Sequence, residues 1–240
     1  MKIIDKIIKK QNSLRENPAV TIALIGDSVT QGCFECYTDG KGDLQTVFDY
    51  ASAYGTRMRE MLNTLYPTVP FHIINAGISG DSAPGGLKRL ERDVLDYHPD
   101  LVVVGFALND STTGAEGLPR YKEAMTEMVR KIMASGAECI VLTPNAMTTT
   151  VSDRIQDHAS EKMAKKLAKI QNDGVLDQYV QAAREIAAEN GATICDVYAK
   201  WKTMLAAGVD VNELLANKLN HPTRKMHYMT AMMLVDCILG

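Results

Sequence analysis

Five short apolar runs alternate with longer segments of helical periodicity along this chain. The run Thr21-Ile22-Ala23-Leu24-Ile25 is apolar and largely β-branched, which is typical of a strand buried on both faces. Because helical segments connect the runs, we expect an α/β fold: a doubly wound, parallel, five-stranded sheet with helices on both faces. The expected strands are 19–25, 71–75, 101–105, 138–143 and 193–196, and the expected helices are 53–65, a segment ending near 97, 120–134, 160–190 and 223–238.

The ends of these elements carry local signals. Gly136 and Gly191 stand where helix C-termini need a left-handed residue, and Pro222 suits the first turn of the last helix. The polar stretch 145–157 has little periodicity, so we expect a long loop after the fourth strand. A loop at that end of a strand is a candidate substrate lid.

Length and charge narrow the class of protein. With 240 residues, 46% of them hydrophobic, the chain suits a single domain over 1–240. A net charge of −3 with interspersed signs gives no electrostatic basis for nucleic-acid binding, and no apolar stretch reaches the length of a membrane span. Charges interrupt the apolar residues of 1–10, so we expect residues 1–16 to form an amphipathic helix docked on the domain rather than a signal peptide.

The cysteines and acidic residues indicate neither disulfides nor a metal. Five cysteines give no disulfide framework, and without an export signal we expect a reducing, cytoplasmic location. Cys33 and Cys36 form a lone CxxC, which we interpret as loop cysteines near a pocket rim. No clustered His, Asp and Glu set suggests a metal, and Gly26-Asp27-Ser28 lacks the glycines of a phosphate-binding loop, so we expect no cofactor.

Candidate chemistry gathers at strand ends. Ser28 follows the first expected strand, Gly80 the second and Asn109 the third, while His221 lies in the last loop. The carboxyl ends of parallel strands meet at one edge of a sheet, so we expect these residues to converge there. Ser28 would be a nucleophile with His221 as its base, although a serine at this place can also simply cap a helix. The Asn109 amide can donate to an oxyanion, and Gly80 can present a backbone N–H with no Cβ in the way.

The segments around these four residues resemble the sequence blocks of the SGNH (GDSL-like) hydrolases. They are Gly26-Asp27-Ser28, Asn75-Ala76-Gly77-Ile78-Ser79-Gly80-Asp81, Gly105-Phe106-Ala107-Leu108-Asn109-Asp110 and Asn220-His221-Pro222, and they occur in the family's order from the first strand to the last helix. The resemblance implies a flavodoxin-like strand order of 2-1-3-4-5. It also implies catalysis by Ser28 and His221, with an oxyanion hole formed by Ser28, Gly80 and Asn109. We expect Asp27 and Asp110 to shape their turns by hydrogen bonding to nearby backbone.

The chain departs from the family pattern at Lys218. Relatives commonly place an Asp three residues before the catalytic His, where it orients the imidazole. Either Ser28 and His221 act as a dyad, or another group accepts the ring's hydrogen bond: Asn217, a backbone carbonyl, or a carboxylate. The candidate carboxylates are Asp196, Asp210 and Glu213.

The other histidines lack this context. We interpret His72, His98 and His158 as structural or surface residues, and His227, on the last helix, as a packing or orienting residue.

The resemblance implies a serine esterase that forms an acyl-enzyme on a small-molecule ester. Small acyl esters, including acetyl groups on a sugar, are the expected substrates. Relatives that cleave thioesters or lysophospholipids leave that alternative open, and the missing Asp leaves open a binding module that has lost turnover.

Overall fold

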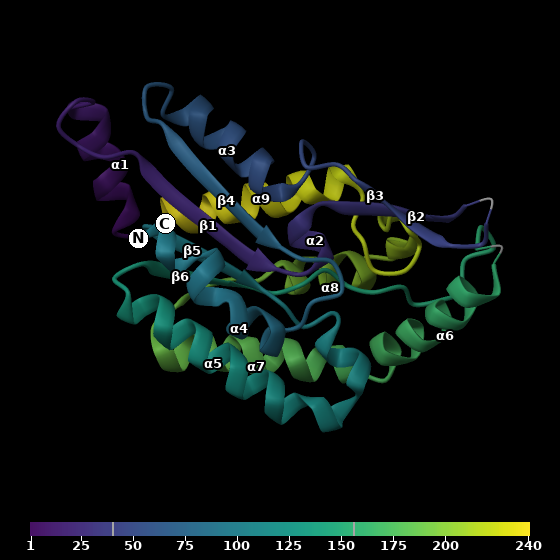
Figure 1. The fold of residues 1–240 in the computed structure, drawn as a ribbon. Helices are drawn as coiled ribbons and strands as arrows, with labels where there is room; N and C mark the ends of the chain where they lie inside the picture. The colour runs from purple at the N-terminus through teal and green to yellow at the C-terminus, as the bar shows by residue number, and fades with distance from the viewer. Residues whose placement is uncertain (40, 156) are drawn as a thin grey trace.

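The computed structural model describes residues 1–39, 41–155 and 157–240. In that part of the chain five parallel strands form one sheet in the order β4-β1-β5-β6-β7, and a separate antiparallel pair joins β2 to β3 (Figure 1). Taken in chain order, the five parallel strands stand 2-1-3-4-5, so the predicted fold class and strand order are confirmed. Their bounds are Val20–Gly26 (β1), Phe71–Gly77 (β4), Leu101–Gly105 (β5), Glu138–Leu142 (β6) and Thr193–Cys195 (β7), with Cys33–Thr38 (β2) and Leu44–Phe48 (β3) in the hairpin.

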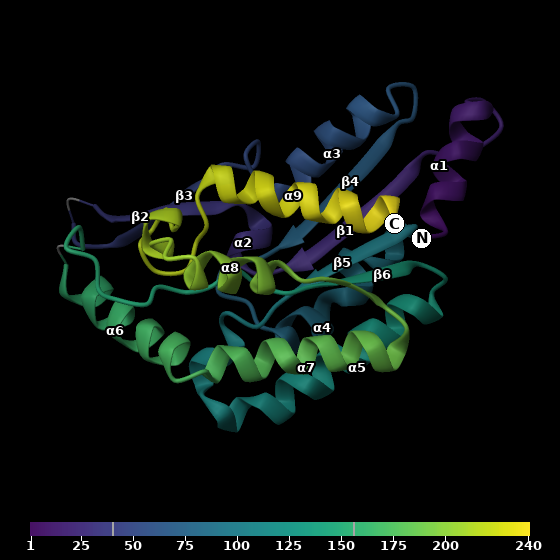
Figure 2. The same ribbon diagram turned by 180° about the vertical axis from the view of Figure 1, so that it is seen from behind.

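Helices cover both faces of the sheet. Figures 1 and 2 show α1, α3 and α9 on one face and α4, α5 and α7 on the other. Their apolar sides pack on β-branched side chains, which is why the central strands are apolar at nearly every position. The bounds are Ile3–Asn12 (α1), Ser28–Gln31 (α2), Tyr54–Leu65 (α3), Ala83–Asp93 (α4), Leu118–Ala134 (α5), His158–Asn172 (α6), Val175–Asn190 (α7), Val197–Ala206 (α8) and Arg224–Leu239 (α9).

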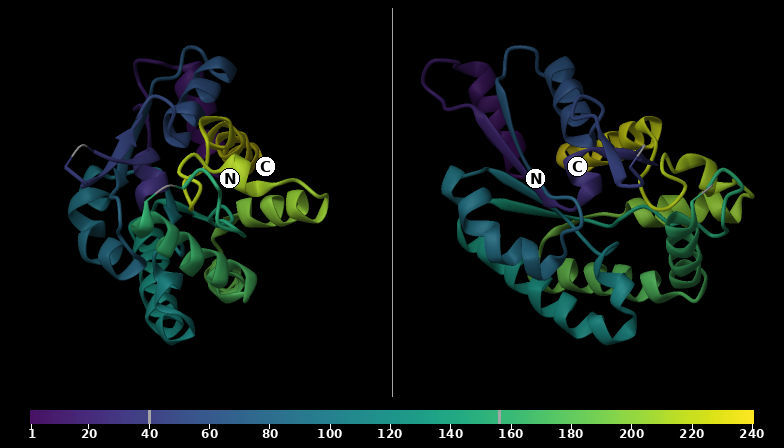
Figure 3. Two further views of the ribbon diagram at one scale, coloured as in Figure 1. Left: turned by 90° about the vertical axis from the view of Figure 1, so that its right-hand side faces the viewer. Right: turned by 45° about the vertical axis from the view of Figure 1, so that its right-hand side comes forward.

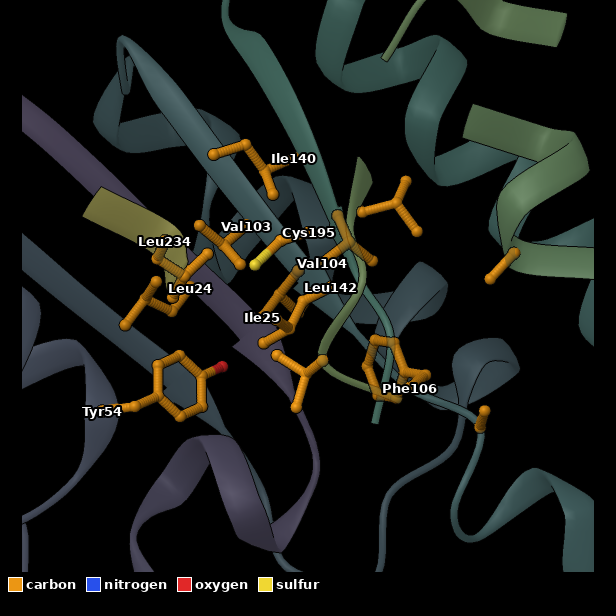
Figure 4. Close-up of a cluster of buried hydrophobic side chains, with 14 of the residues drawn as sticks. Leu24, Ile25, Tyr54, Val103, Val104, Phe106, Ile140, Leu142, Cys195 and Leu234 are labelled. Carbon is orange, nitrogen blue, oxygen red and sulfur yellow. The ribbon is translucent and has the colours of Figure 1, made fainter. Parts of the chain in front are cut away.

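The core continues beneath the carboxyl edge of the sheet. Figure 4 shows Leu24 of β1 and Val103 of β5 in one cluster with Tyr54 of α3 and Leu234 of α9. All four side chains are buried. The strand ends that carry the candidate site therefore rest on a close-packed base.

Helix boundaries differ from the sequence-based expectation in the second half of the chain. The helix predicted over 160–190 is two helices, because Gly174 adopts a left-handed conformation (φ 73°) between α6 and α7. The last helix begins at Arg224, since Pro222 instead pairs with Leu215 in an isolated β-bridge. Gly136 (φ 92°) and Gly191 (φ 68°) have the positive φ expected after a helix. The structure also adds four short 3₁₀ turns in the described residues: Leu95–Tyr97 (η1), Asp110–Thr113 (η2), Ala115–Gly117 (η3) and Val211–Leu214 (η4).

The hairpin corrects the interpretation of the CxxC pair. Cys33 and Cys36 lie on β2 and not in a loop, and a register shift falls between them. Both thiols are free, and Cys33 is buried. The mixture of polar and apolar residues in β2 hid the strand from a search for apolar runs.

Helix α1 packs on the sheet through one side. Ile3 and Ile7 are buried in the core, whereas Ile8 is exposed. The Glu138 carboxylate accepts the backbone N–H groups of Lys2 and Ile3, which places negative charge at the helix N-terminus. The helix ends at Asn12, earlier than the predicted 1–16 segment. Among the described helices, none has both the length and the apolar character needed to cross a membrane.

The stretch 145–157 follows β6 without helix or strand in its described residues, and Gln156 lies outside them. Its first part is held in the interior: the Met147 N–H donates to the Gln171 side chain and the Thr148 N–H to the Leu219 carbonyl. Ala146, Met147 and Thr148 are buried. A lid could therefore include only the later part of this loop.

Candidate active site

Three glycines align at the carboxyl edge of the sheet. Gly26 of β1 is paired in register with Gly77 of β4 and with Gly105 of β5. A Cβ on Gly26 would lie 2.5 Å from the Gly105 carbonyl and 2.1 Å from the Thr30 hydroxyl, so this close approach requires glycine. Since β4, β1 and β5 are neighbours in the sheet, the loops carrying Ser28, Gly80 and Asn109 leave it side by side. Figure 3 gives two further views of this fold.

Ser28 is the first residue of α2. The Asp27 carboxylate caps this short helix by accepting the Val29 N–H at 2.9 Å, which confirms the expected turn-shaping role. Ser28 is only 4% exposed. Within the described residues its backbone N–H donates to no protein atom.

The structure brings Ser28 and His221 into contact. His221 Nε2 lies 2.9 Å from Ser28 Oγ, and His221 Nδ1 lies 3.0 Å from the carbonyl oxygen of Phe34. A carbonyl only accepts, so Nδ1 carries the ring proton and Nε2 is free to accept the Ser28 hydroxyl proton. This is the tautomer that a general base requires.

A backbone carbonyl therefore occupies the role that an Asp fills in the family pattern. None of the three carboxylates considered from the sequence contacts the ring in the described structure. Asp196 binds Arg184, Asp210 accepts the Asn212 N–H, and Glu213 pairs with Arg154 and Lys218.

Asn217 positions the loop of His221 and does not touch its ring. The Asn217 Oδ1 atom accepts the backbone N–H groups of Leu219, Asn220 and His221 at 3.0, 2.9 and 2.9 Å. The alternative in which Asn217 orients the imidazole is wrong, because its acceptor oxygen is used by the main chain. Lys218 adopts a left-handed conformation (φ 58°) in this turn.

The expected oxyanion donors stand on neighbouring loops. The Ser79 N–H donates to Gln31 Oε1 at 2.6 Å, which fixes the Gly80 loop beside α2. Asn109 Nδ2 donates one hydrogen to the Asp81 carbonyl at 2.8 Å, which leaves its second hydrogen available. Gly80 has a φ of 78° and, in the described part of the chain, its N–H has no protein acceptor.

Asp110 supports the Asn109 turn. Its two oxygens accept the Ala83 N–H at 2.9 Å and the Ala107 N–H at 3.1 Å, as expected for a turn-shaping residue. Ala107 has a φ of 119°, which is strained for a residue with a Cβ. The hydrogen bond from the Ala107 N–H to Asp110 thus stabilises the strained backbone two residues before Asn109.

Arg89 was missed in the sequence and joins the loops together. This nearly buried side chain donates to the Gly26 carbonyl (3.0 Å), the Ala76 carbonyl (2.5 Å) and the Asp81 carboxylate (2.8 Å). Through these hydrogen bonds a single side chain connects β1, β4 and the Gly80 loop. Its position in the helical repeat could have indicated this role, because Arg89 lies on the same helical face as the buried Ala83 and Gly86.

Burial dominates the electrostatics of the site. Burial lowers the pKa of His221 below 6.5, and its bond to the Phe34 carbonyl opposes that shift only in part. Burial raises the pKa of Asp27 to about 7 and that of Asp110 to about 6. At neutral pH the His221 imidazole is thus in its neutral, proton-accepting form.

His227 packs behind this pair. Its Nδ1 accepts the Tyr54 N–H at 3.1 Å, and its ring lies 4.7 Å from the Phe34 ring. Burial lowers the pKa of His227 to about 3, so it stays neutral and contributes packing. The other three histidines, His72, His98 and His158, are exposed.

A cavity of about 560 Å³ opens beside Gly80 and Asn109. Hydroxyl and charged side chains form part of its lining: Ser82, Asp110, Thr112, Thr113, Glu116 and Arg120. In the described residues no group of three or more His, Cys, Asp or Glu side chains could hold a metal ion.

Comparison with known proteins gives consistent matches. The model of the GDSL-like Lipase/Acylhydrolase family matches residues 24–229. An acetylxylan esterase of Geobacillus stearothermophilus is 22% identical over 193 residues, which make up 77% of this chain and 78% of the relative.

Solved structures share the fold. The crystal structure of an acetylxylan esterase from Geobacillus stearothermophilus superposes with a TM-score of 0.67 at 20% identity, covering 91% of this chain and 94% of that one. A two-domain esterase active on acetylated mannans superposes with a TM-score of 0.68 at 19% identity, covering 98% of this chain and 52% of that one.

Proposed function

The chain belongs to the GDSL-like lipase/acylhydrolase family and is a carboxylic ester hydrolase, and we propose that Ser28 is its nucleophile and His221 its general base. One observation carries the proposal: Ser28 Oγ lies 2.9 Å from His221 Nε2, whose ring is oriented by the Phe34 carbonyl. A serine hydroxyl becomes an effective nucleophile when a base of suitable pKa removes its proton during attack.

The reaction proceeds through an acyl-enzyme. Ser28 attacks the ester carbonyl as His221 takes its proton, and the same proton then passes to the leaving alcohol. The N–H groups of Ser28 and Gly80 and the free amide hydrogen of Asn109 bind the developing oxyanion. Water activated by His221 releases the acyl group.

Replacing Asn109 with Ala should lower kcat by roughly 10²–10³-fold, since one oxyanion donor contributes about 2.7–4 kcal/mol to the transition state. The effect on KM should be small because the charge develops only in the transition state. Steady-state kinetics of the variant measure both parameters. A change confined to KM would mean that Asn109 only binds substrate, and the melting temperature reports the separate loss of the bond to Asp81.

The substrate that we propose is a small acyl ester of a carbohydrate, such as an O-acetyl sugar. Two observations support it: hydroxyl and charged side chains line the cavity beside the oxyanion donors, and the relatives are named as esterases of acetylated xylan and mannan. A long acyl chain would need an extended apolar channel. The thioesterase or lysophospholipase alternative predicts such a preference for long chains.

A chain-length series of p-nitrophenyl esters tests the acyl preference. We expect kcat/KM to be highest for acetate and to fall by about tenfold or more by octanoate, because hydroxyl and charged side chains in the lining of the cavity gain little from added methylenes. Acetylated xylo- and manno-oligosaccharides then test the alcohol part, with Ser28→Ala as the blank. Preference for octanoate or for acyl thioesters would favour the alternative.

An inactive binding module of the same fold was considered because the family Asp is absent. The Phe34 carbonyl removes the reason for that reading, since the imidazole has an acceptor that selects the active tautomer. Hydrolysis of p-nitrophenyl acetate that depends on Ser28 would exclude an inactive module.

We further propose that the enzyme works in the cytoplasm. Cys33, Cys139 and Cys195 are buried free thiols, a state that a reducing compartment preserves. Fractionation of the native host, followed by detection of the chain, tests this location.

A further inference from the structure

We propose that Arg224 is a positioning residue for His221: it holds the β2–β3 hairpin so that the Phe34 carbonyl keeps the imidazole in its active tautomer. The inference rests on the proposed roles of Ser28 and His221. It adds a side chain outside the four sequence blocks to the apparatus that orients the base.

Arg224 forms hydrogen bonds at both ends of the β2–β3 hairpin, where β2 begins and β3 has ended. Its Nη1 and Nη2 atoms donate to the two carboxylate oxygens of Glu35, at 2.5 and 3.2 Å, and its Nε donates to Asp49 Oδ2 at 2.8 Å. Its guanidinium also lies 4.4 Å from the centre of the Phe34 ring. Glu35 is on β2 and Asp49 follows β3, so one side chain fixes the base of the hairpin from both sides.

These hydrogen bonds lie next to the orienting carbonyl. The peptide group that carries the Phe34 oxygen is the one joining Phe34 to Glu35, and Arg224 contacts both of these side chains. Arg224 is also the first residue of α9, three positions after His221. The base and its acceptor are therefore tied to each other through one arginine, although they lie 187 residues apart in the chain.

The hairpin needs such an anchor because it is a sheet of its own. It pairs with no strand of the main sheet in the described structure, and Figures 1 and 2 show it projecting beside the start of α9. An isolated two-stranded hairpin is marginally stable. A displacement of about 1 Å would take the 3.0 Å contact beyond hydrogen-bond range, and misplacement on that scale can lower rates by about 10²-fold.

The charges agree with this arrangement. The Arg224 guanidinium lowers the pKa of Glu35 and of Asp49, so both carboxylates remain ionised at neutral pH. The three side chains are partly exposed, so the gain in global stability is small. Loss of the Arg224 contacts with Glu35 and Asp49 is therefore expected to leave the enzyme folded but its His221 ring misoriented.

Arg224→Lys tests the proposal, because lysine keeps the charge but cannot reproduce the forked contacts. We expect kcat for p-nitrophenyl acetate to fall by about 10- to 100-fold with little change in KM. The ¹⁵N NMR spectrum of the free enzyme should lose the single Nδ1–H tautomer of His221 in favour of a tautomer mixture. Glu35→Gln, which leaves Arg224 in place, should move both readouts in the same direction.

Arg184→Lys is the matched control. Arg184 makes a similar forked contact with Asp196, at 2.8 and 3.3 Å and with 36% side-chain exposure against 39% for Arg224, yet it bonds to neither His221 nor Phe34. We expect kcat and the His221 signals of this variant to match the wild type.

Two outcomes would overturn the role of Arg224: wild-type kcat in Arg224→Lys, or a lost kcat with the Nδ1–H tautomer intact. The NMR readout needs no turnover. A tautomer change in Arg224→Lys combined with full activity of His221→Ala would therefore refute the proposed function while leaving the positioning contact established.

Discussion

Ser28→Ala should abolish ester hydrolysis and leave the fold intact. The substitution removes the proposed nucleophile and one hydrogen bond, to His221, while the Asp27 cap and the packing of α2 remain. Loss of a catalytic serine typically lowers kcat by about 10⁶-fold. Turnover of p-nitrophenyl acetate and the melting temperature measure the two effects. A fluorophosphonate probe should label Ser28, as identified by peptide mass spectrometry.

Ser135→Ala serves as the control for this experiment. Ser135 caps the end of α5, where its hydroxyl donates to the Ile132 carbonyl, so its loss should change neither turnover nor labelling. Labelling of a serine other than Ser28, or substantial turnover by Ser28→Ala, would show that the nucleophile has been misassigned.

The sheet was predictable because buried parallel strands have a simple signature. Val102, Val103 and Val104 of β5 are all fully buried in a sheet covered on both faces, so the sequence of this strand is an uninterrupted apolar run. The β2–β3 hairpin has no such signature. Its strand Cys33–Thr38 runs from buried to exposed, and its neighbours are polar turn residues. A strand whose burial changes along its length leaves no regular period to detect.

The side chains of the candidate site were predictable because their identity carries the chemistry. Ser28, Asn109 and His221 are recognisable because few residue types can serve as nucleophile, uncharged donor or base. The acceptor that orients His221 is a main-chain carbonyl, and every residue has one. Nothing in the amino-acid sequence distinguishes the carbonyl group of Phe34 from those of its neighbours. Its selection depends on where the hairpin lies in three dimensions.

His221→Ala should remove nearly all activity, by roughly 10⁴-fold or more. The wild-type enzyme should also stay active at lower pH than an enzyme whose catalytic imidazole has an ordinary pKa. The base works in its neutral form, so kcat/KM falls when the pH drops through the pKa of His221. Burial lowers that pKa, and in the part of the chain that the structure describes no carboxylate contacts the ring to raise it again. We therefore expect the acidic limb of kcat/KM below pH 6.5.

Amide variants of the remaining carboxylates decide whether the acceptor is the carbonyl. Asp196→Asn, Asp210→Asn and Glu213→Gln should leave the acidic limb in place, because these groups bind Arg184, the Asn212 N–H and Lys218 instead. Lys218→Ala should likewise retain activity. Collapse of one amide variant would mean that a carboxylate reaches the ring during turnover.

The limb must also be assigned to the right group. Asp27 adjoins Ser28 and has a pKa raised to about 7, so its ionisation also changes as the pH is lowered from neutrality. Following the His221 ¹⁵N signals with pH separates the two, because only the ring reports its own protonation. We expect a single Nδ1–H tautomer that becomes protonated below pH 6.5, in step with the loss of kcat/KM. If Asp27→Asn instead shifts the acidic limb of kcat/KM while the titration of the His221 imidazole stays unchanged, the limb belongs to Asp27. That result would contradict the expected control by His221.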